Sequence, residues 1–150
     1  MAEAATGTFI DALNEAQAIV RRQYPQAQLY EASINLALIG SGWRFVFNDP
    51  STVPNSTIFL KQFEGRFGTP EHVRSIWVED RPIQLPITLD LAEAERMCQQ
   101  GGCIGKISNL TLRYPLGLGV NEPYYIITMA SENKRCWVGV NSRSVSCQPL

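Results

Sequence analysis

Cysteine is the residue in this 150-residue chain with the most chemistry open to it, because a thiol can be a nucleophile, a metal ligand or half of a disulfide. All four cysteines lie in the second half: Cys98, Cys103, Cys136 and Cys147. Their spacing does not form the short pairs that bind zinc, and the one histidine, His72, is far away in sequence. We therefore expect no metal and no cofactor, and the thiols are either free and buried or bonded to one another.

Strand register offers one disulfide candidate, although four cysteines allow three pairings. If residues 136–140 and 143–147 form a hairpin around a two-residue turn, Cys136 and Cys147 face each other at a distance near that of a disulfide. A four-residue turn would spoil this register. Cys98 and Cys103 form the other candidate pair, and free thiols in a reducing cytoplasm are the alternative.

No constellation of side chains indicates catalysis. His72 follows Pro70-Glu71 in a predicted turn, which is typical of a surface residue rather than a general base. Cys98 falls on an apolar helix stripe, where thiols are usually inert. The motifs of serine hydrolases, zinc peptidases and phosphate-binding loops are absent. We therefore favour a protein that is not an enzyme.

The aromatic residues of the predicted strands are candidates for binding. Trp43 shares a strand face with two phenylalanines, which predicts a core position. Trp137 alternates with its neighbours Cys136 and Val138 and must point to the opposite face, where an exposed tryptophan would anchor a partner and a second buried layer is the alternative. The candidate binding residues are Trp137, Trp77, Tyr124 and Tyr125.

Two helices are predicted to position these strands. The first begins at Thr8, with Asp11 as its capping partner, and ends before Pro25. The second begins at Asp90 as N-cap, with Glu93 at the capping-box position, and ends at a pair of glycines.

Four strands follow each helix, at 29–38, 43–47, 57–63 and 74–79 in the first half and at 110–114, 124–130, 136–140 and a last segment ending at 147 in the second. This order predicts an α+β fold of two helix-plus-four-stranded antiparallel sheet units in tandem. We assign residues 1–80 to the first unit, 81–87 to a connector and 88–150 to the second unit. Because each unit is small, we expect the two to share a face.

Composition limits the partners. Thirteen basic and fourteen acidic residues give a net charge of -1, which argues against binding to nucleic acid. No apolar run approaches the ~20 residues that span a bilayer, so we expect no membrane partner. The first seven residues lack the charged and apolar regions of a secretory signal. As the chain stands, this predicts a cytoplasmic protein, or a secreted one if Met1 replaces a signal peptide.

Ala16 lies in the predicted first helix, the sequence Tyr24-Pro25 is followed by Ala27, and Leu29 stands at the start of the next strand. On these features, residues 9–47 resemble the PepSY family. Gln26 stands where that family usually has glycine, and the second half matches in layout, with two glycines in place of Tyr-Pro. PepSY-like and cystatin-like modules lay a helix across an antiparallel sheet. The resemblance implies a non-catalytic tandem module that acts as an inhibitory or chaperone-like domain, with peptidases among its expected partners.

Two functions follow as expectations. The leading one is a protein-binding or inhibitor-like module that uses a sheet face or a loop against a protein partner. The alternative is one α+β domain with a curved sheet that encloses a small apolar ligand or substrate. The two differ in whether the concave side of the sheet is filled by the helices. Candidate lining residues in the alternative are Trp43, Phe45, Tyr124 and Tyr125.

Overall fold

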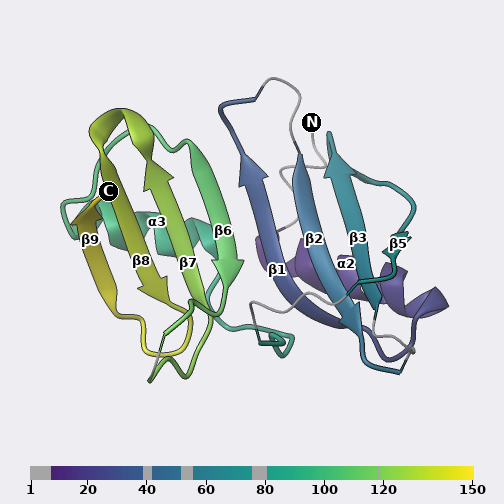
Figure 1. The fold of residues 1–150 in the computed structure, drawn as a ribbon. Helices are drawn as coiled ribbons and strands as arrows, with labels where there is room; N and C mark the ends of the chain where they lie inside the picture. Colours follow the sequence, from purple (N-terminus) through teal and green to yellow (C-terminus); the bar gives the residue numbers. More distant parts are fainter. Residues whose placement is uncertain (1–7, 39–41, 52–55, 76–80, 118) are drawn as a thin grey trace.

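A computed structural model describes residues 8–38, 42–51, 56–75, 81–117 and 119–150. Two helices lie on one side of an antiparallel sheet, and the other side carries none of the described helices (Figure 1). In chain order the elements are α2 (Phe9–Gln23), β1 (Gln28–Asn35), β2 (Trp43–Asp49), β3 (Ser56–Phe63), β4 (Arg66–Phe67), β5 (Glu71–Val73), α3 (Leu91–Gln100), β6 (Asn109–Arg113), β7 (Tyr124–Met129), the 3-10 turn η1 (Ala130–Glu132), β8 (Lys134–Gly139) and β9 (Val145–Pro149).

The nine strands form one sheet, in the order β4-β3-β2-β1-β6-β7-β8-β9, with β5 paired to β3. Its two halves join where β1 pairs with β6, from Glu31 opposite Arg113 to Asn35 opposite Asn109. The α+β class is confirmed, but two separate four-stranded units that share a face are not what forms. The first strand after each helix would otherwise leave its backbone donors and acceptors at an exposed edge, and the β1–β6 pairing satisfies them.

Helix α2 begins as its sequence predicts. The Thr8 hydroxyl accepts the Asp11 N–H at 3.0 Å, and the Asp11 carboxylate accepts the Thr8 N–H at 3.2 Å, which completes a capping box. Leu13, Ala16 and Val20 recur on one helix face and are fully buried against the sheet. Packing of this face, more than intrinsic propensity, holds the helix on β1–β3.

Helix α3 begins at the predicted N-cap residue, but without the predicted capping box. Asp90 occupies the N-cap position, but its side chain makes no cap hydrogen bond to its own helix. Its carboxylate instead accepts the N–H of Ile10, at 3.0 Å, in the first turn of α2. The capping box expected with Glu93 is therefore wrong. One carboxylate lies at the start of both helices, where it complements the partial positive charge of each.

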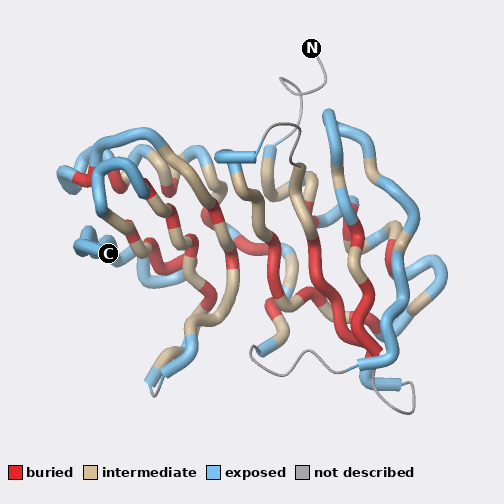
Figure 2. Tube along the Cα trace, turned by 45° about the horizontal axis from the view of Figure 1, so that its top comes forward, coloured by how far each residue is buried: buried red, intermediate tan, exposed pale blue. Residues whose placement is uncertain are grey.

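The core lies between the helices and the sheet (Figure 2). Alternate side chains of the strands are buried there, among them Phe45 and Phe47 on β2 and Leu110 and Leu112 on β6. Strand β1 is shorter than expected, because it ends at Asn35 rather than at residue 38. Leu36 and Leu38 follow the strand and are 47% and 61% exposed.

The end of the first half also departs from the prediction. The fourth strand expected at 74–79 does not begin at Arg74 or Ser75, and residues 76–80 lie outside the described part of the chain. Two short strands, β4 and β5, pair with β3 instead. Ile83 forms an isolated bridge with Leu29 and is 3% exposed, so the expected connector contributes to the core.

Two disulfides fasten the second half: Cys98–Cys136, which joins α3 to β8, and Cys103–Cys147, which joins the segment after α3 to β9. The expected register is confirmed, since Cys136 lies opposite Cys147 and Val138 opposite Val145. Both candidate bonds, Cys136–Cys147 and Cys98–Cys103, are wrong, and so is the alternative of free thiols. Both strand cysteines point toward the helix side of the sheet, where Cys98 on α3 and Cys103 in the segment after it lie within bonding distance.

Candidate functional site

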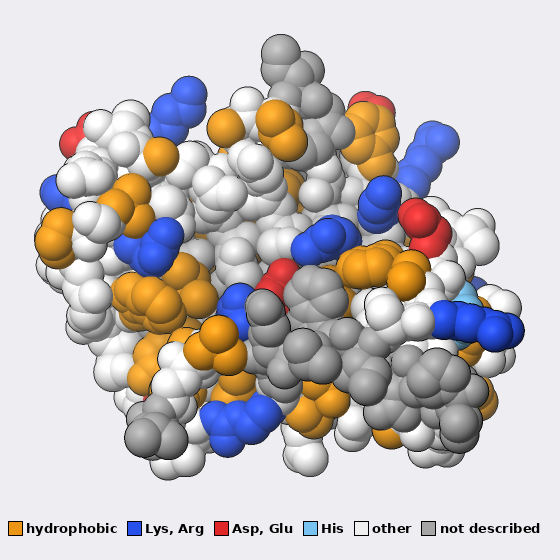
Figure 3. Space-filling model, viewed as in Figure 1, with side chains coloured by type: hydrophobic (Ala, Val, Ile, Leu, Met, Phe, Trp, Pro, Cys, Tyr) orange, Lys and Arg blue, Asp and Glu red, His pale blue; other side chains and the backbone are white. Residues whose placement is uncertain are grey.

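The candidate site is the open face, by which we mean the side of the sheet opposite α2 and α3. Alternation along the strands decides which side chains point there, because their neighbours are buried under the helices. Figure 3 views this face and shows apolar and basic side chains distributed across it. Its described side chains include Glu31, Arg44, Phe59, Lys61, Thr111, Arg113, Tyr124, Ile126, Thr128, Arg135, Trp137 and Gln148.

An aromatic patch, made of Tyr124, Ile126 and Trp137, lies on the β7–β8 half of the open face. Ile126 and Trp137 are directly opposite each other in the strand register. The rings of Tyr124 and Trp137 meet edge to face, with centroids 6.4 Å apart. All three side chains are half-buried, so each is held in place and still presents surface to solvent. The predicted orientation of Trp137, away from Cys136 and Val138, is confirmed.

Tyr125 is not part of this patch, although it was a candidate together with Tyr124. It points to the helix side, is 1% exposed, and its hydroxyl donates to the Leu89 carbonyl at 2.7 Å. Burial, with the nearby Asp90 carboxylate as a second cause, raises the pKa of the Tyr125 phenol far above its usual value. Tyr125 is therefore a neutral hydrogen-bond donor in the core rather than a surface contact.

Arg135 lies on the same side of β8 as Trp137 and two residues before it. Its strand neighbours are Thr128 on β7 and Gln148 on β9, both uncharged. The Nε of Arg135 is buried and has no hydrogen-bond partner among the described residues. This end of the guanidinium therefore lies against the sheet, and its Nε–H donor makes no hydrogen bond to a described residue.

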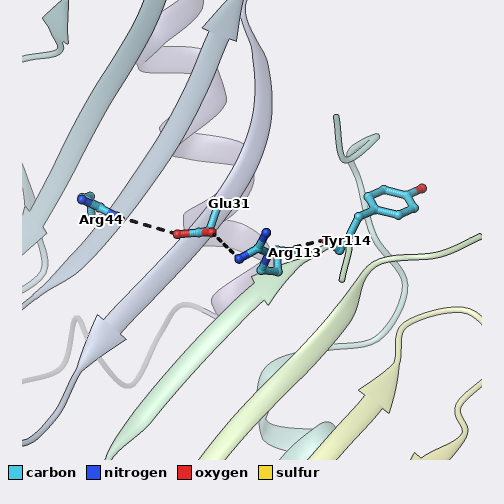
Figure 4. Close-up of polar contacts among 4 residues, drawn as sticks. All are labelled: Glu31, Arg44, Arg113 and Tyr114. Atoms are coloured by element: carbon cyan, nitrogen blue, oxygen red, sulfur yellow. Dashed lines mark hydrogen bonds and ion pairs between the residues drawn. The ribbon is translucent and has the colours of Figure 1, made fainter. Parts of the chain in front are cut away.

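A charged cluster lies across the joint between the two halves (Figure 4). The Glu31 carboxylate on β1 is 3.7 Å from Arg44 on β2 and 3.7 Å from Arg113 on β6. The side chain of Glu31 is only 9% exposed, so two guanidiniums offset the cost of burying its charge. Arg44 also lies 5.2 Å over the Phe59 ring. Sequence reasoning missed this cluster, because Arg113 becomes a neighbour of Glu31 only when β1 pairs with β6.

The remaining candidates do not form a second site. Trp77 lies outside the described residues. The pocket alternative required Trp43, Phe45, Tyr124 and Tyr125 to line one cavity. Phe45 and Tyr125 are instead buried under the helices, and Trp43 packs at 4.5 Å on Phe9 of α2, while Tyr124 points to the opposite face.

A groove of about 290 Å³ lies elsewhere, between the connector and the ends of the second-half strands. Its lining residues are Pro82, Gln84, Pro86, Ile87, Thr88, Tyr114, Pro123, Val140 and Asn141. His72 is remote from it on β5, where it is exposed and stacks on Tyr24 with ring centroids 5.6 Å apart. The described residues contain no group of three or more potential metal-ligating side chains.

No family model matches the chain, and no curated protein matches it. Among solved structures, the chain is similar to a "putative lipoprotein" from Clostridium difficile 630, a crystal structure at 1.85 Å resolution. The TM-score is 0.65 at 13% sequence identity, over 95% of this chain and 93% of that one. Neither described helix is both long and apolar enough to cross a membrane. At 13% identity the likeness shows the fold alone, so the resemblance of residues 9–47 to PepSY modules stays a prediction.

Proposed function

We propose that this chain is a non-catalytic protein-binding module that docks a protein partner on its open face. The observation that carries the proposal is the aromatic patch, which is half-buried on a sheet face with no described helix over it. Tryptophan and tyrosine are the residues most often found at the energetic centre of protein interfaces. A sheet supplies such residues with a rigid support, so little conformational entropy is lost when a partner binds.

The disulfides support both parts of this proposal. All four cysteines are described and none is free, so no thiol is available as a nucleophile. Disulfides form and persist mainly in oxidising compartments. We therefore infer that the protein works outside the reducing cytoplasm, which favours the secreted alternative over the cytoplasmic one. Inhibition of a peptidase belongs to the proposal as one form that partner binding can take, on the strength of the PepSY-like and cystatin-like resemblance.

The test is selection of peptides from a random display library against the whole protein, followed by affinity measurements on variants. We expect the selected peptides to bind Trp137→Ala at least tenfold more weakly, since a buried interface tryptophan contributes more than about 1.4 kcal/mol. Leu116→Ala is the matched control, because Leu116 is 69% exposed and belongs to the loop between β6 and β7 rather than to a strand of the open face. Peptides that bind both variants as tightly as the original protein would show that the partner docks elsewhere.

A further inference from the structure

We propose that the partner segment carries a carboxylate two residues from an apolar or aromatic side chain, with Arg135 receiving the carboxylate and the aromatic patch receiving the apolar group. This inference rests on the proposed function and specifies the chemistry of its partner. The partner is then an extended acidic and apolar stretch of a protein, laid along β8.

The first step of the argument is charge. The side chains that β7, β8 and β9 send to the open face are Tyr124, Ile126, Thr128, Arg135, Trp137, Ser146 and Gln148. Arg135 is the one ionised group in that set, and no ion pair joins it to a described acidic residue. Arg44 and Arg113 differ, because they already share the Glu31 carboxylate. The strands β7, β8 and β9 therefore present one positive and no negative side chain on the open face, although the whole chain has a net charge of -1. The Glu122 carboxylate, in the segment before β7, already accepts the N–H groups of Asn141 and Ser142.

The second step is the unmet donor. The buried Nε–H of Arg135 has no partner among the described residues, and a buried unsatisfied donor destabilises the state that contains it. A carboxylate binds guanidinium best side-on, through two parallel N–H···O bonds. If the side chain rotates toward an incoming carboxylate, Nε and one Nη can both donate to it. A neutral partner group would not offer this pair of acceptors in the same geometry.

The third step is spacing. Arg135 and Trp137 lie two residues apart on one strand, so their side chains leave the same face about 7 Å apart. An extended partner segment has the same repeat, since its residues i and i+2 also point to one side at that spacing. One partner side chain can then meet Arg135 while the next on that side meets Trp137 and Tyr124.

The same library selection tests this inference through the sequences it returns. We expect Asp or Glu to be enriched two positions from an aromatic or aliphatic residue. Arg135→Gln should weaken these peptides at least tenfold and remove most of the salt dependence of their binding. The matched control is Arg22→Gln, which removes one charge from an exposed position on α2.

The possible results distinguish a failure of the paired recognition by Arg135 and the aromatic patch from a failure of docking on the open face. Peptides that depend on Trp137 but lack the acidic position, or that bind Arg135→Gln at full strength, would overturn the inference and leave the open face as the docking site. Peptides that need Arg135 but not Trp137 would overturn the paired recognition proposed here. Thermal melting of each variant shows whether a loss of binding reflects a loss of folding.

Discussion

Glu122 lies beyond the aromatic patch, in the segment before β7, and its carboxylate holds the turn between β8 and β9. One oxygen, Oε1, accepts the N–H groups of Asn141 and Ser142, each at 2.7 Å. The approach is close, because a Cβ added at Gly139 would lie 2.8 Å from the other carboxylate oxygen. Partial burial works to raise the pKa of Glu122, but the hydrogen bonds from Ser142 and Asn141 outweigh it and the net pKa is lowered below 4.5.

This lowered pKa predicts a pH-dependent contribution to stability. A group whose folded pKa lies below its unfolded value stabilises the folded state above the unfolded pKa, and the contribution is lost as pH falls through the folded pKa. Glu122→Ala should therefore melt at a lower temperature than the original protein at pH 7, and the difference should shrink as pH falls below 4.5. Thermal melts at several pH values provide the measurement. A difference that stays constant down to pH 2 would mean that the charge of Glu122 has no part in holding the turn.

Residue-level prediction from sequence worked where local periodicity decided the outcome. The orientation of Trp137 and the capping of α2 by Thr8 each depend on a few consecutive residues. The ion pair between Glu31 and Arg113 could not be predicted in the same way, because the two residues are distant in sequence and adjacent only in the sheet. The capping box expected at Asp90 failed for a related reason, although Asp90 is the N-cap residue as predicted. Its carboxylate accepts the N–H of Ile10, which is 80 residues away in sequence.

At the scale of elements, β9 is held to the rest of the molecule mainly by covalent and backbone bonds. All five of its residues are exposed, so it buries no side chain in the core. It keeps its place through its ladder with β8 and through the Cys103–Cys147 disulfide. The partner cysteine, Cys103, is completely buried, so the bond ties an exposed edge strand to a fixed point.

Removing the two disulfides should therefore have different local effects. Their sequence separations of 38 and 44 residues are similar, and each loop closure contributes about 4 kcal/mol to the free energy of unfolding in the chain-entropy model. In Cys103→Ala/Cys147→Ala we expect β9 amides to exchange hydrogen much faster while α3 stays protected. In Cys98→Ala/Cys136→Ala the exchange should instead increase in α3, which loses its bond to β8.

Hydrogen exchange read by mass spectrometry, with each double variant serving as control for the other, distinguishes these results. Equal exchange of β9 in both variants would show that the ladder with β8 suffices. Mass before and after alkylation of the unfolded, unreduced protein checks the bonds themselves, and four alkylated thiols would contradict both. The sequence predicted the register of Cys136 and Cys147 correctly. It could not predict the bonds, because nothing in a hairpin pattern says where a helix will cross it.

At the scale of the whole molecule, the two halves share one sheet and one core. The core cluster contains Leu13, Phe45 and Leu60 from the first half together with Leu112, Tyr125 and Val138 from the second. The pattern of one helix followed by strands was evident in each half of the sequence, which is why the α+β class could be predicted. The way in which the halves meet could not be predicted, because strand periodicity identifies the buried face of a strand but not which strand pairs with its edge.

This joint predicts that the halves unfold together. Three kinds of contact connect the halves. Strand β1 pairs with β6 over five positions, and the Asp90 carboxylate accepts the N–H of Ile10. The ring centroids of Phe9 and Tyr125 lie 6.0 Å apart. Unfolding one half would expose the β1 or β6 edge and part of the common core of the other, so partly folded states should be too costly to accumulate.

Single-tryptophan variants can follow each half separately. Trp77→Phe/Trp137→Phe leaves Trp43, which packs on α2 in the first half, and Trp43→Phe/Trp77→Phe leaves Trp137 on β8 in the second. We expect the urea midpoint from fluorescence to equal the midpoint from far-UV circular dichroism in each variant, because one transition is then seen by both probes. A Trp43 signal and a Trp137 signal that each depart from the circular dichroism curve, in opposite directions, would mean two independently folding units. The β1–β6 ladder would then be a contact between domains rather than the centre of one.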